Sequence, residues 1–425
     1  MKEEKEERRL EAVNETIRGE VVLNEAVPRE ELNARRERFL KKMDELAPGW
    51  ETVILVSRVN QLYFAGTMQD GVMTFQKDGS RKLFVRRSFE RACDESNLPR
   101  DEILPMSSFR NLASALGEEI GETYVEKDVL TVSILEMMER YLKIRALKSV
   151  DPIVARVRAV KSPWEMKWLE LAGRQHHLFM TEILPTYFRE GMSECDLAGE
   201  IYRGALKCGY QGVTRFGMFQ CEVAYGQYGF GESSLYPTNF NGPGGSRGMS
   251  AASPFTGSRE IRLERGMSVF ADMSFAVNGY HTDKTQVFFF RGDGSEAKIP
   301  EEALEAHEKC RELELAIADR LRPGAIPGEI YADIMESLPK DFLVNFQGFG
   351  ARSVKFLGHS IGLQVDEYPV LARGFSEPLE ENVLFAVEPK KGIAGYGTVG
   401  VEDTFVVTPD GGRCLTGKPD GILEI

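Results

Sequence analysis

Residues 266–290, GMSVFADMSFAVNGYHTDKTQVFFF, decide the fold of this chain. Two apolar runs flank a central Asn-Gly dipeptide, which best fits a type I′ hairpin turn, so the segment predicts two antiparallel strands. With a two-residue loop, Ser274 lies opposite Asp283, and Asp272 lies two positions beyond Ser274. We therefore expect Asp272 and Asp283 to be diagonal neighbours on one face of a sheet.

Two aspartates that face each other in so apolar a sheet repel and raise each other's pKa, so the arrangement needs a cation. Three further candidate ligands have similar surroundings: Glu388 ends the run NVLFAVE, Glu402 opens the run EDTFVVT, and His359 lies between glycines in FLGHSIG. One imidazole with four carboxylates favours manganese, iron, cobalt or zinc over metals that prefer thiolates. Together the five residues predict a site for a pair of divalent metal ions.

Composition bounds the class of protein. The chain has 425 residues, 42% of them hydrophobic, which is enough for two domains. Its formal charge of −13 disfavours nucleic acid or an anionic membrane as a partner, because phosphate binding needs a basic stripe. No apolar stretch follows the first residues, MKEEKEERRL, so we expect no signal peptide, no membrane anchor and a cytoplasmic location. The six cysteines form no C-x-x-C pair and are expected to be reduced.

The first 157 residues are predicted to form an α/β domain of their own, with residues 1–20 as a charged N-terminal extension. A helical pattern covers residues 28–46. The segments ETVILVSRVNQLYFAGT, TFQKDG and RKLFVRR that follow it are interpreted as strands separated by turns.

A second, α+β domain is predicted for residues 158–425. It begins with a helix, because Ser162 can cap it, Pro163 suits its first position and Glu165 can close a capping box. We expect helices and glycine-punctuated strands in the following ranges: helices at 164–187, 193–207 and 300–320, and strands at 266–290 and 382–408.

The segments DMSFAVNGYHTD, GHSIG, VEP and VEDT resemble the pita-bread metallopeptidase superfamily, which holds methionine aminopeptidase, Xaa-Pro aminopeptidase, Xaa-Pro dipeptidase and creatinase. The two-domain layout, with VSRVNQLYFAGT in the first domain and RAVKSPWEMKWLELA at the junction, is similar to the Xaa-Pro peptidase branch. The resemblance implies an α+β fold, in which a creatinase-like N-terminal α/β domain precedes a C-terminal pita-bread domain.

The resemblance also implies a mechanism and partners. Asp283 and Glu402 would bridge two divalent ions (manganese, cobalt, zinc or iron). Asp272 would complete the coordination of one ion, and His359 and Glu388 would complete the coordination of the other. A water between the ions would attack the scissile carbonyl, and Glu388 would take its proton. The substrate would be a short peptide, and the chain would form a homodimer.

Several family positions are changed here. The stretch LYPTNFNGPGGSRG lacks the histidine that the family's peptidases carry before the first aspartate. His281 is a candidate replacement, although a hydrogen-bonded structural role is the alternative. Asp366 stands where a proton-handling histidine is usual, so it is either a general acid or a salt-bridged or turn-forming residue. Gln286 and Gly400 stand where arginines are usual, and their loss removes positive charge near the ligands.

An aromatic segment precedes the metal-binding strands, and it either lines an apolar substrate pocket or packs in the core. Its members include Tyr236 and Phe240, which are the candidate substrate-binding residues. The leading hypothesis is therefore a dinuclear Xaa-Pro peptidase. The alternatives are a metal-dependent hydrolase or lyase of a small non-peptide molecule, and a non-catalytic binding protein on the same fold.

Overall fold

The computed structural model describes residues 25–292, 294–418 and 420–425. These residues divide into two compact units, one that reaches Arg158 and one that starts at Ala159. No helix in the described part of the chain has both the length and the apolar character to cross a membrane.

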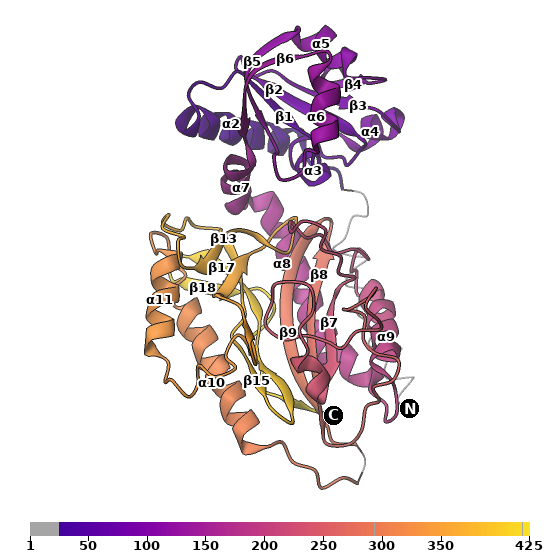
Figure 1. Ribbon diagram of the computed structural model, residues 1–425, viewed down its shortest axis with the longest axis vertical. Coiled ribbons are helices and arrows are strands. Elements are labelled where there is room, and N and C mark those ends of the chain that lie inside the picture. The colour runs from indigo at the N-terminus through magenta and orange to yellow at the C-terminus, as the bar shows by residue number, and fades with distance from the viewer. Residues whose placement is uncertain (1–24, 293, 419) are drawn as a thin grey trace. The chain divides into compact units, whose positions relative to one another are not determined.

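The first unit is a six-stranded mixed sheet with helices on both faces (Figure 1). Phe39 and Phe64 pack against Phe75 on one face, whereas Leu112 and Met138 belong to a cluster on the other. The strand order is β4-β3-β2-β1-β5-β6, formed by β1 (Thr52–Leu55), β2 (Gly71–Gln76), β3 (Arg81–Val85), β4 (Ile103–Pro105), β5 (Glu119–Val125) and β6 (Lys143–Ser149). The helices are α2 (Arg29–Leu46), α3 (Arg58–Ala65), α4 (Phe89–Glu95), α5 (Arg110–Leu116), α6 (Val132–Glu139) and α7 (Asp151–Ala159).

One sequence expectation fails in this unit. The segment ETVILVSRVNQLYFAGT was interpreted as strand, but only β1 is extended and RVNQLYFA forms α3. The Ser57 side chain accepts a hydrogen bond from the Asn60 amide, and Gly66 ends the helix with a φ of 73°. A serine cap and a left-handed glycine therefore override the β-forming residues between them.

The second unit contains two larger sheets and two small ones. The first sheet has the order β19-β9-β8-β7, formed by β7 (Gly226–Phe230), β8 (Met267–Val277), β9 (Tyr280–Phe290) and β19 (Leu423–Glu424). The second has the order β13-β12-β14-β17-β18, formed by β12 (Phe356–Ser360), β13 (Glu367–Ala372), β14 (Leu384–Val387), β17 (Asp403–Thr408) and β18 (Gly411–Cys414). The small sheets pair β15 (Lys390–Ile393) with β16 (Gly397–Gly400), and β10 (Gly348–Phe349) with β11 (Arg352–Ser353).

Helices lie on both sides of these sheets, α8 and α9 on one side and α10 and α11 on the other (Figure 1). The bounds are α8 (Pro163–Leu178), α9 (Glu194–Lys207), α10 (Glu301–Ala318) and α11 (Pro327–Ser337). Ser162 and Glu165 form the expected capping box, with Pro163 in the first turn. The helix predicted for 164–187 is α-helical only to Leu178, and a π turn and a 3₁₀ turn containing Pro185 follow, because proline donates no backbone hydrogen bond.

The hairpin predicted from the Asn-Gly dipeptide is confirmed. Asn278 and Gly279 have φ values of 49° and 92°, and Ser274 pairs with Asp283 in the β8–β9 register. The Asp283 amide donates to Thr404 Oγ1 at 2.8 Å, and that hydroxyl donates back to the Asp283 carbonyl at 3.0 Å. These bonds join β9 to β17 and so bring the two larger sheets together at Asp283.

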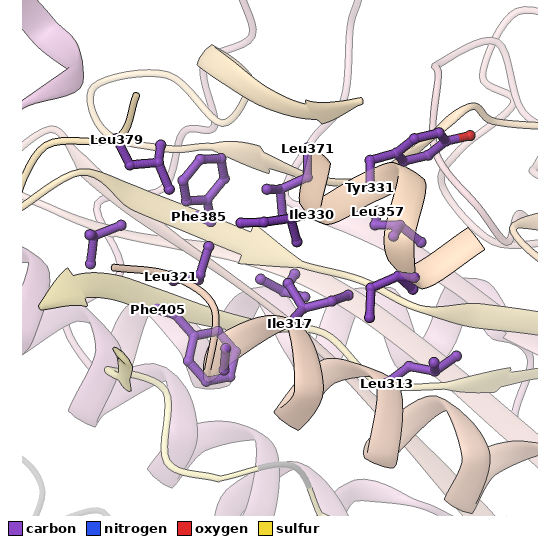
Figure 2. Packing of buried hydrophobic residues seen from close by; sticks show 14 of the residues in the cluster. Leu313, Ile317, Leu321, Ile330, Tyr331, Leu357, Leu371, Leu379, Phe385 and Phe405 are labelled. Carbon is purple, nitrogen blue, oxygen red and sulfur yellow. The ribbon is translucent and has the colours of Figure 1, made fainter. Parts of the chain in front are cut away.

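The core between α10, α11 and the second sheet fixes which side chains of that sheet face the site. Figure 2 shows Phe385 packed among aliphatic residues of both helices, and Val387 belongs to the same buried cluster. Because side chains alternate along a strand, Ala386 faces the other way, as do its cross-strand partners His359 and Thr404. Each fully buried aliphatic or aromatic side chain contributes about 1.5–3 kcal/mol, so this core holds the opposite face in place.

Candidate metal centre

The five expected ligands meet at one cavity of the second unit. Asp272 and Asp283 come from β8 and β9, His359 comes from β12, Glu388 follows β14, and Glu402 precedes β17. All five line the cavity. Each is buried, with 8% exposure at Asp272 and 1% at Glu402 as the extremes. Segments more than a hundred residues apart in the sequence therefore converge on one acidic site.

Three of these residues form the tightest group. Within the described ranges, Asp283, His359 and Glu402 each offer a ligand atom within 4.8 Å of the other two. His359 Nε2 lies 3.9 Å from Glu402 Oε1, while Nδ1 lies 3.1 Å from the Ser360 carbonyl oxygen. A carbonyl partner at Nδ1 leaves Nε2 as the nitrogen available to a metal. Two carboxylates and one imidazole suit a divalent cation, so the group fits the metal that the resemblance implies.

A lysine that sequence reasoning missed also reaches the site. Lys390 begins β15, two residues after Glu388, and its side chain is fully buried. Its Nζ donates to Glu402 Oε2 at 2.6 Å, to Asp272 Oδ2 at 3.0 Å and to Glu388 Oε2 at 3.0 Å. On the Asp272 side, an ammonium group therefore already engages the carboxylate oxygens. The available signal in the sequence was a lysine directly after Glu388-Pro389, one of the two lysines of the segment VEPKKG.

Burial and mutual repulsion shape the electrostatics. Burial raises the pKa of Asp272 to about 6, and it raises the pKa of Asp283 well above its ordinary value, with Glu402 and Asp272 adding to the effect. Burial also raises the pKa values of Glu388 and Glu402. Burial alone would lower the pKa of Lys390, but Asp272, Glu402 and Glu388 raise it well above the usual range. The site thus holds its lysine charged and has an excess of acid that favours a further cation.

Neighbouring polar groups hold the ligands in place. Thr285 Oγ1 donates to Glu402 Oε2 at 3.0 Å, and Gln227 Nε2 donates to Asp272 Oδ2 at 3.5 Å. Asp272 and Glu402, two of the three carboxylates that bind Lys390, therefore each have a second hydrogen-bond partner.

The candidate proton-transfer residues differ in position. Asp366 lines the cavity, and its Oδ1 lies 3.5 Å from His359 Nδ1. His281 is fully buried, with Nδ1 3.0 Å from the Gly362 carbonyl oxygen, while Nε2 accepts from the Arg215 amide at 3.2 Å. Burial lowers the pKa of His281 to about 4, so the ring is neutral. Both ring nitrogens are hydrogen-bonded to main-chain atoms, which favours the structural role of His281 over a role in proton transfer.

Apolar residues also line the cavity, which has about 430 Å³ of empty space, part of it open to solvent. Its apolar lining comprises Phe216, Val223, Tyr225, Phe240 and Val365. Tyr236 does not line the cavity: its side chain is 47% exposed, and its ring lies under the Arg247 guanidinium, which is 4.3 Å from the ring centre. Of the two candidate substrate-binding residues, the structure brings only Phe240 to the site.

Comparisons with known proteins agree with this architecture. Residues 167–409 match the model of metallopeptidase family M24, and residues 35–160 match that of the creatinase/prolidase N-terminal domain. The Xaa-Pro dipeptidase of Pyrococcus furiosus is 23% identical over 388 residues, which is 91% of this chain and 98% of that protein.

Solved structures share the fold that the sequence predicted. The prolidase from Pyrococcus horikoshii OT3 has a TM-score of 0.71 and 21% identity, covering 91% of this chain and 99% of its own. Dipeptidase PepE from Mycobacterium ulcerans has a TM-score of 0.76 and 18% identity, covering 94% of this chain and 99% of its own. The α+β architecture, with a creatinase-like N-terminal domain before the catalytic-type domain, is confirmed.

Proposed function

The chain belongs to metallopeptidase family M24, and we propose that its substrates are short Xaa-Pro peptides, above all Xaa-Pro dipeptides. The family and enzyme class expected from the sequence, a hydrolytic metallopeptidase, are confirmed. Support for the substrate comes from relatives named Xaa-Pro dipeptidase in two Pyrococcus species and in Lactobacillus helveticus.

The observation that carries the proposal is a buried acid and imidazole group that faces an apolar pocket. Phe240 and Val365 line this pocket together with Asp283 and His359. A proline ring is compact and apolar, so it suits such a wall, while the scissile carbonyl would lie toward the ligands.

We propose that Asp283, His359 and Glu402 hold a divalent ion, which manganese, cobalt, zinc or iron would satisfy. When bound, the ion acts as a Lewis acid on the scissile carbonyl and lowers the pKa of water. Glu388 would accept the proton of the attacking water; its Oε2 accepts from Lys390, and its Oε1 lies 3.6 Å from His359 Nε2. Asp366, at the side of the same cavity, is the candidate donor to the leaving nitrogen.

One observation favours a second candidate, a hydrolase or lyase of a small non-peptide molecule. His359 is the sole histidine among the cavity-lining residues, and it already belongs to the three-residue metal group. The family's usual imidazole proton donors therefore have no counterpart at this cavity. A reaction whose leaving group needs less protonation than a peptide nitrogen would suit the site.

The test is release of free proline, measured by mass spectrometry, from Ala-Pro and Leu-Pro with added Mn²⁺. Ala-Ala and Leu-Ala are the matched dipeptides, and Glu388→Gln is the control variant. The wild type is expected to release proline, and Glu388→Gln is expected to lose about 10²–10⁴-fold of this activity, as for the removal of a positioned general base. No release by metal-loaded protein would remove the peptide proposal in favour of the non-peptide or non-catalytic alternatives.

A homodimer and a cytoplasmic location remain predictions. Sedimentation of the purified protein would test the first, and fractionation of the source cells the second.

A further inference from the structure

We propose that the Lys390 ammonium group takes the place of one of the two divalent ions, so that each chain binds a single divalent ion at Asp283, His359 and Glu402. The inference deepens the proposed function, on which it rests for the presence of one ion, but not for the substrate. It changes the expected metal content from two ions to one.

The ammonium group of Lys390 is coordinated as a bound cation would be. Lys390 Nζ has three hydrogens, and it meets three carboxylate oxygens at 2.6, 3.0 and 3.0 Å. These oxygens belong to residues of three separate chain segments, and the lysine is fully shielded from water. All three N–H groups of the ammonium therefore donate to carboxylates that were expected to bind metal. A metal ion in this position would contact the same carboxylates.

The two carboxylate oxygens of Glu402 face different partners. Oε2 accepts from Lys390, while Oε1 lies 3.9 Å from His359 Nε2. The carboxylate therefore still bridges two cation positions, with the ammonium on the Asp272 side and the three-residue group on the other. Asp272 and Glu388 are absent from that group of described residues, and both are bound to Lys390 instead.

Hydrogen bonds also hold the main chain of Lys390 in position. The Lys390 amide donates to Gln347 Oε1 at 2.8 Å, and the Gln347 amide donates to the Lys390 carbonyl at 2.8 Å. The Lys390 backbone is also paired with Gly400 in β15–β16. The main chain of Lys390 is thus held by Gln347 and by Gly400, and its side chain is fully buried.

The net charge of the candidate metal centre also bears on the number of ions. With four carboxylates and one ammonium, one divalent ion leaves the site with one net negative charge, whereas two divalent ions would leave it with one net positive charge. A second divalent ion on the Asp272 side would sit against the ammonium and compete for the same oxygens, which like-charge repulsion in a buried site opposes. A different role for Lys390, in which it only replaces the arginine expected at Gly400 and leaves room for both ions, predicts two bound ions.

The neighbouring lysine provides a matched control. Lys391 lies beside Lys390 in β15, but its Nζ donates to the main-chain carbonyls of Phe342, at 2.9 Å, and Val344. It contacts none of the five carboxylate or imidazole groups in the described structure. Replacing Lys391 therefore removes a neighbouring positive charge without opening the site.

The experiment measures Mn²⁺ stoichiometry on chelator-treated full-length protein, by mass spectrometry of bound metal and by electron paramagnetic resonance. The proposal expects one ion per chain and the spectrum of an isolated Mn²⁺ in the wild type and in Lys391→Ala. Lys390→Gly should take up a second ion and show the spectrum of a coupled pair.

Two bound ions in the wild type, or none, would overturn the proposal, as would a folded Lys390→Gly protein that still binds one. Should Lys390→Gly fail to fold, Lys390→Ala replaces it, and the wild-type stoichiometry decides in either case. One bound ion without cleavage of peptides would contradict the proposed substrate and support the single-ion site. Cleavage by a protein that binds two ions would support the proposed substrate and contradict the single-ion site.

Discussion

Lys284 and Asp403 form a buried ion pair directly behind the candidate metal centre, with Nζ and Oδ1 2.7 Å apart and each side chain 1% exposed. Each residue follows a candidate ligand, Asp283 or Glu402, and strand alternation turns it away from the cavity. Thr416 Oγ1 also donates to Asp403 Oδ1, at 2.6 Å. The pair therefore ties together the two strands that carry the ligands.

Asp403→Asn is expected to lower the free energy of unfolding by about 3–5 kcal/mol, because it leaves the Lys284 ammonium buried without its counter-ion. Urea unfolding followed by circular dichroism measures the loss. The control is Arg413→Ala, which breaks a solvent-exposed pair with Glu170 at 2.7 Å and should cost less than about 1 kcal/mol. Equal losses in both variants would contradict the assigned role.

His307 predicts a loss of stability on acidification. Its Nδ1 accepts from the Gly400 amide at 3.2 Å and its Nε2 lies 3.0 Å from the Asp420 carbonyl oxygen, so the fold requires the neutral ring. Burial lowers the pKa of His307 to about 4. Because the unfolded chain binds the proton more readily, this stability is present above the unfolded pKa of about 6.5 and is lost as the pH falls toward 4.

Between pH 7 and pH 5, the wild type should therefore lose about 2 kcal/mol more stability than His307→Asn. Urea unfolding at the two pH values gives the difference. The same pH dependence in both proteins would show that His307 does not carry it.

Phe240→Ala is expected to raise the KM for Ala-Pro about tenfold or more, because a ring that packs on an apolar substrate group contributes about 1.5–3 kcal/mol when buried. The value of kcat should change little, since none of the described contacts joins Phe240 to a candidate metal-binding residue. Tyr236→Ala is the matched control, because this ring is 47% exposed and does not line the cavity. An equal effect of both substitutions would count against the pocket.

Asp366→Asn separates two roles of that carboxylate. If Asp366 supplies the leaving-group proton, kcat for Leu-Pro should fall about a hundredfold or more while Mn²⁺ affinity stays close to that of the wild type. Kinetics and metal titration on the same preparation measure both. A loss of Mn²⁺ affinity in place of kcat would mean that Asp366, 3.5 Å from His359 Nδ1, only orients the imidazole.

The hairpin and the convergence of the candidate ligands on one cavity were predictable because their signals are local. An Asn-Gly dipeptide between alternating apolar runs sets the register that pairs Ser274 with Asp283. Short apolar runs that end or begin on a carboxylate likewise marked Glu388 and Glu402. In each case a window of a dozen residues carries the physical cause.

Lys390 could not be assigned in this way, because its environment is made by partners far away in the sequence. The Lys390 and Lys391 side chains are adjacent and chemically identical, yet one reaches three carboxylates and the other reaches carbonyls of the chain near Phe342. Tyr236 could not be assigned for the same reason, since only the path of the loop decides whether an aromatic ring enters the cavity. Helix α3 failed because two capping residues outweighed its composition.

Gly400 restricts how this sequence can evolve. Its φ is 124°, and a Cβ there would lie 2.4 Å from the Pro389 carbonyl oxygen and 2.7 Å from Lys390 Cα. Any other residue at this position would bring its Cβ against the main chain of Pro389 and Lys390 and strain the backbone beside that lysine. The choice of residue at position 400 is therefore limited by backbone geometry, and an arginine there is expected to disturb the contacts of Lys390 with the three carboxylates.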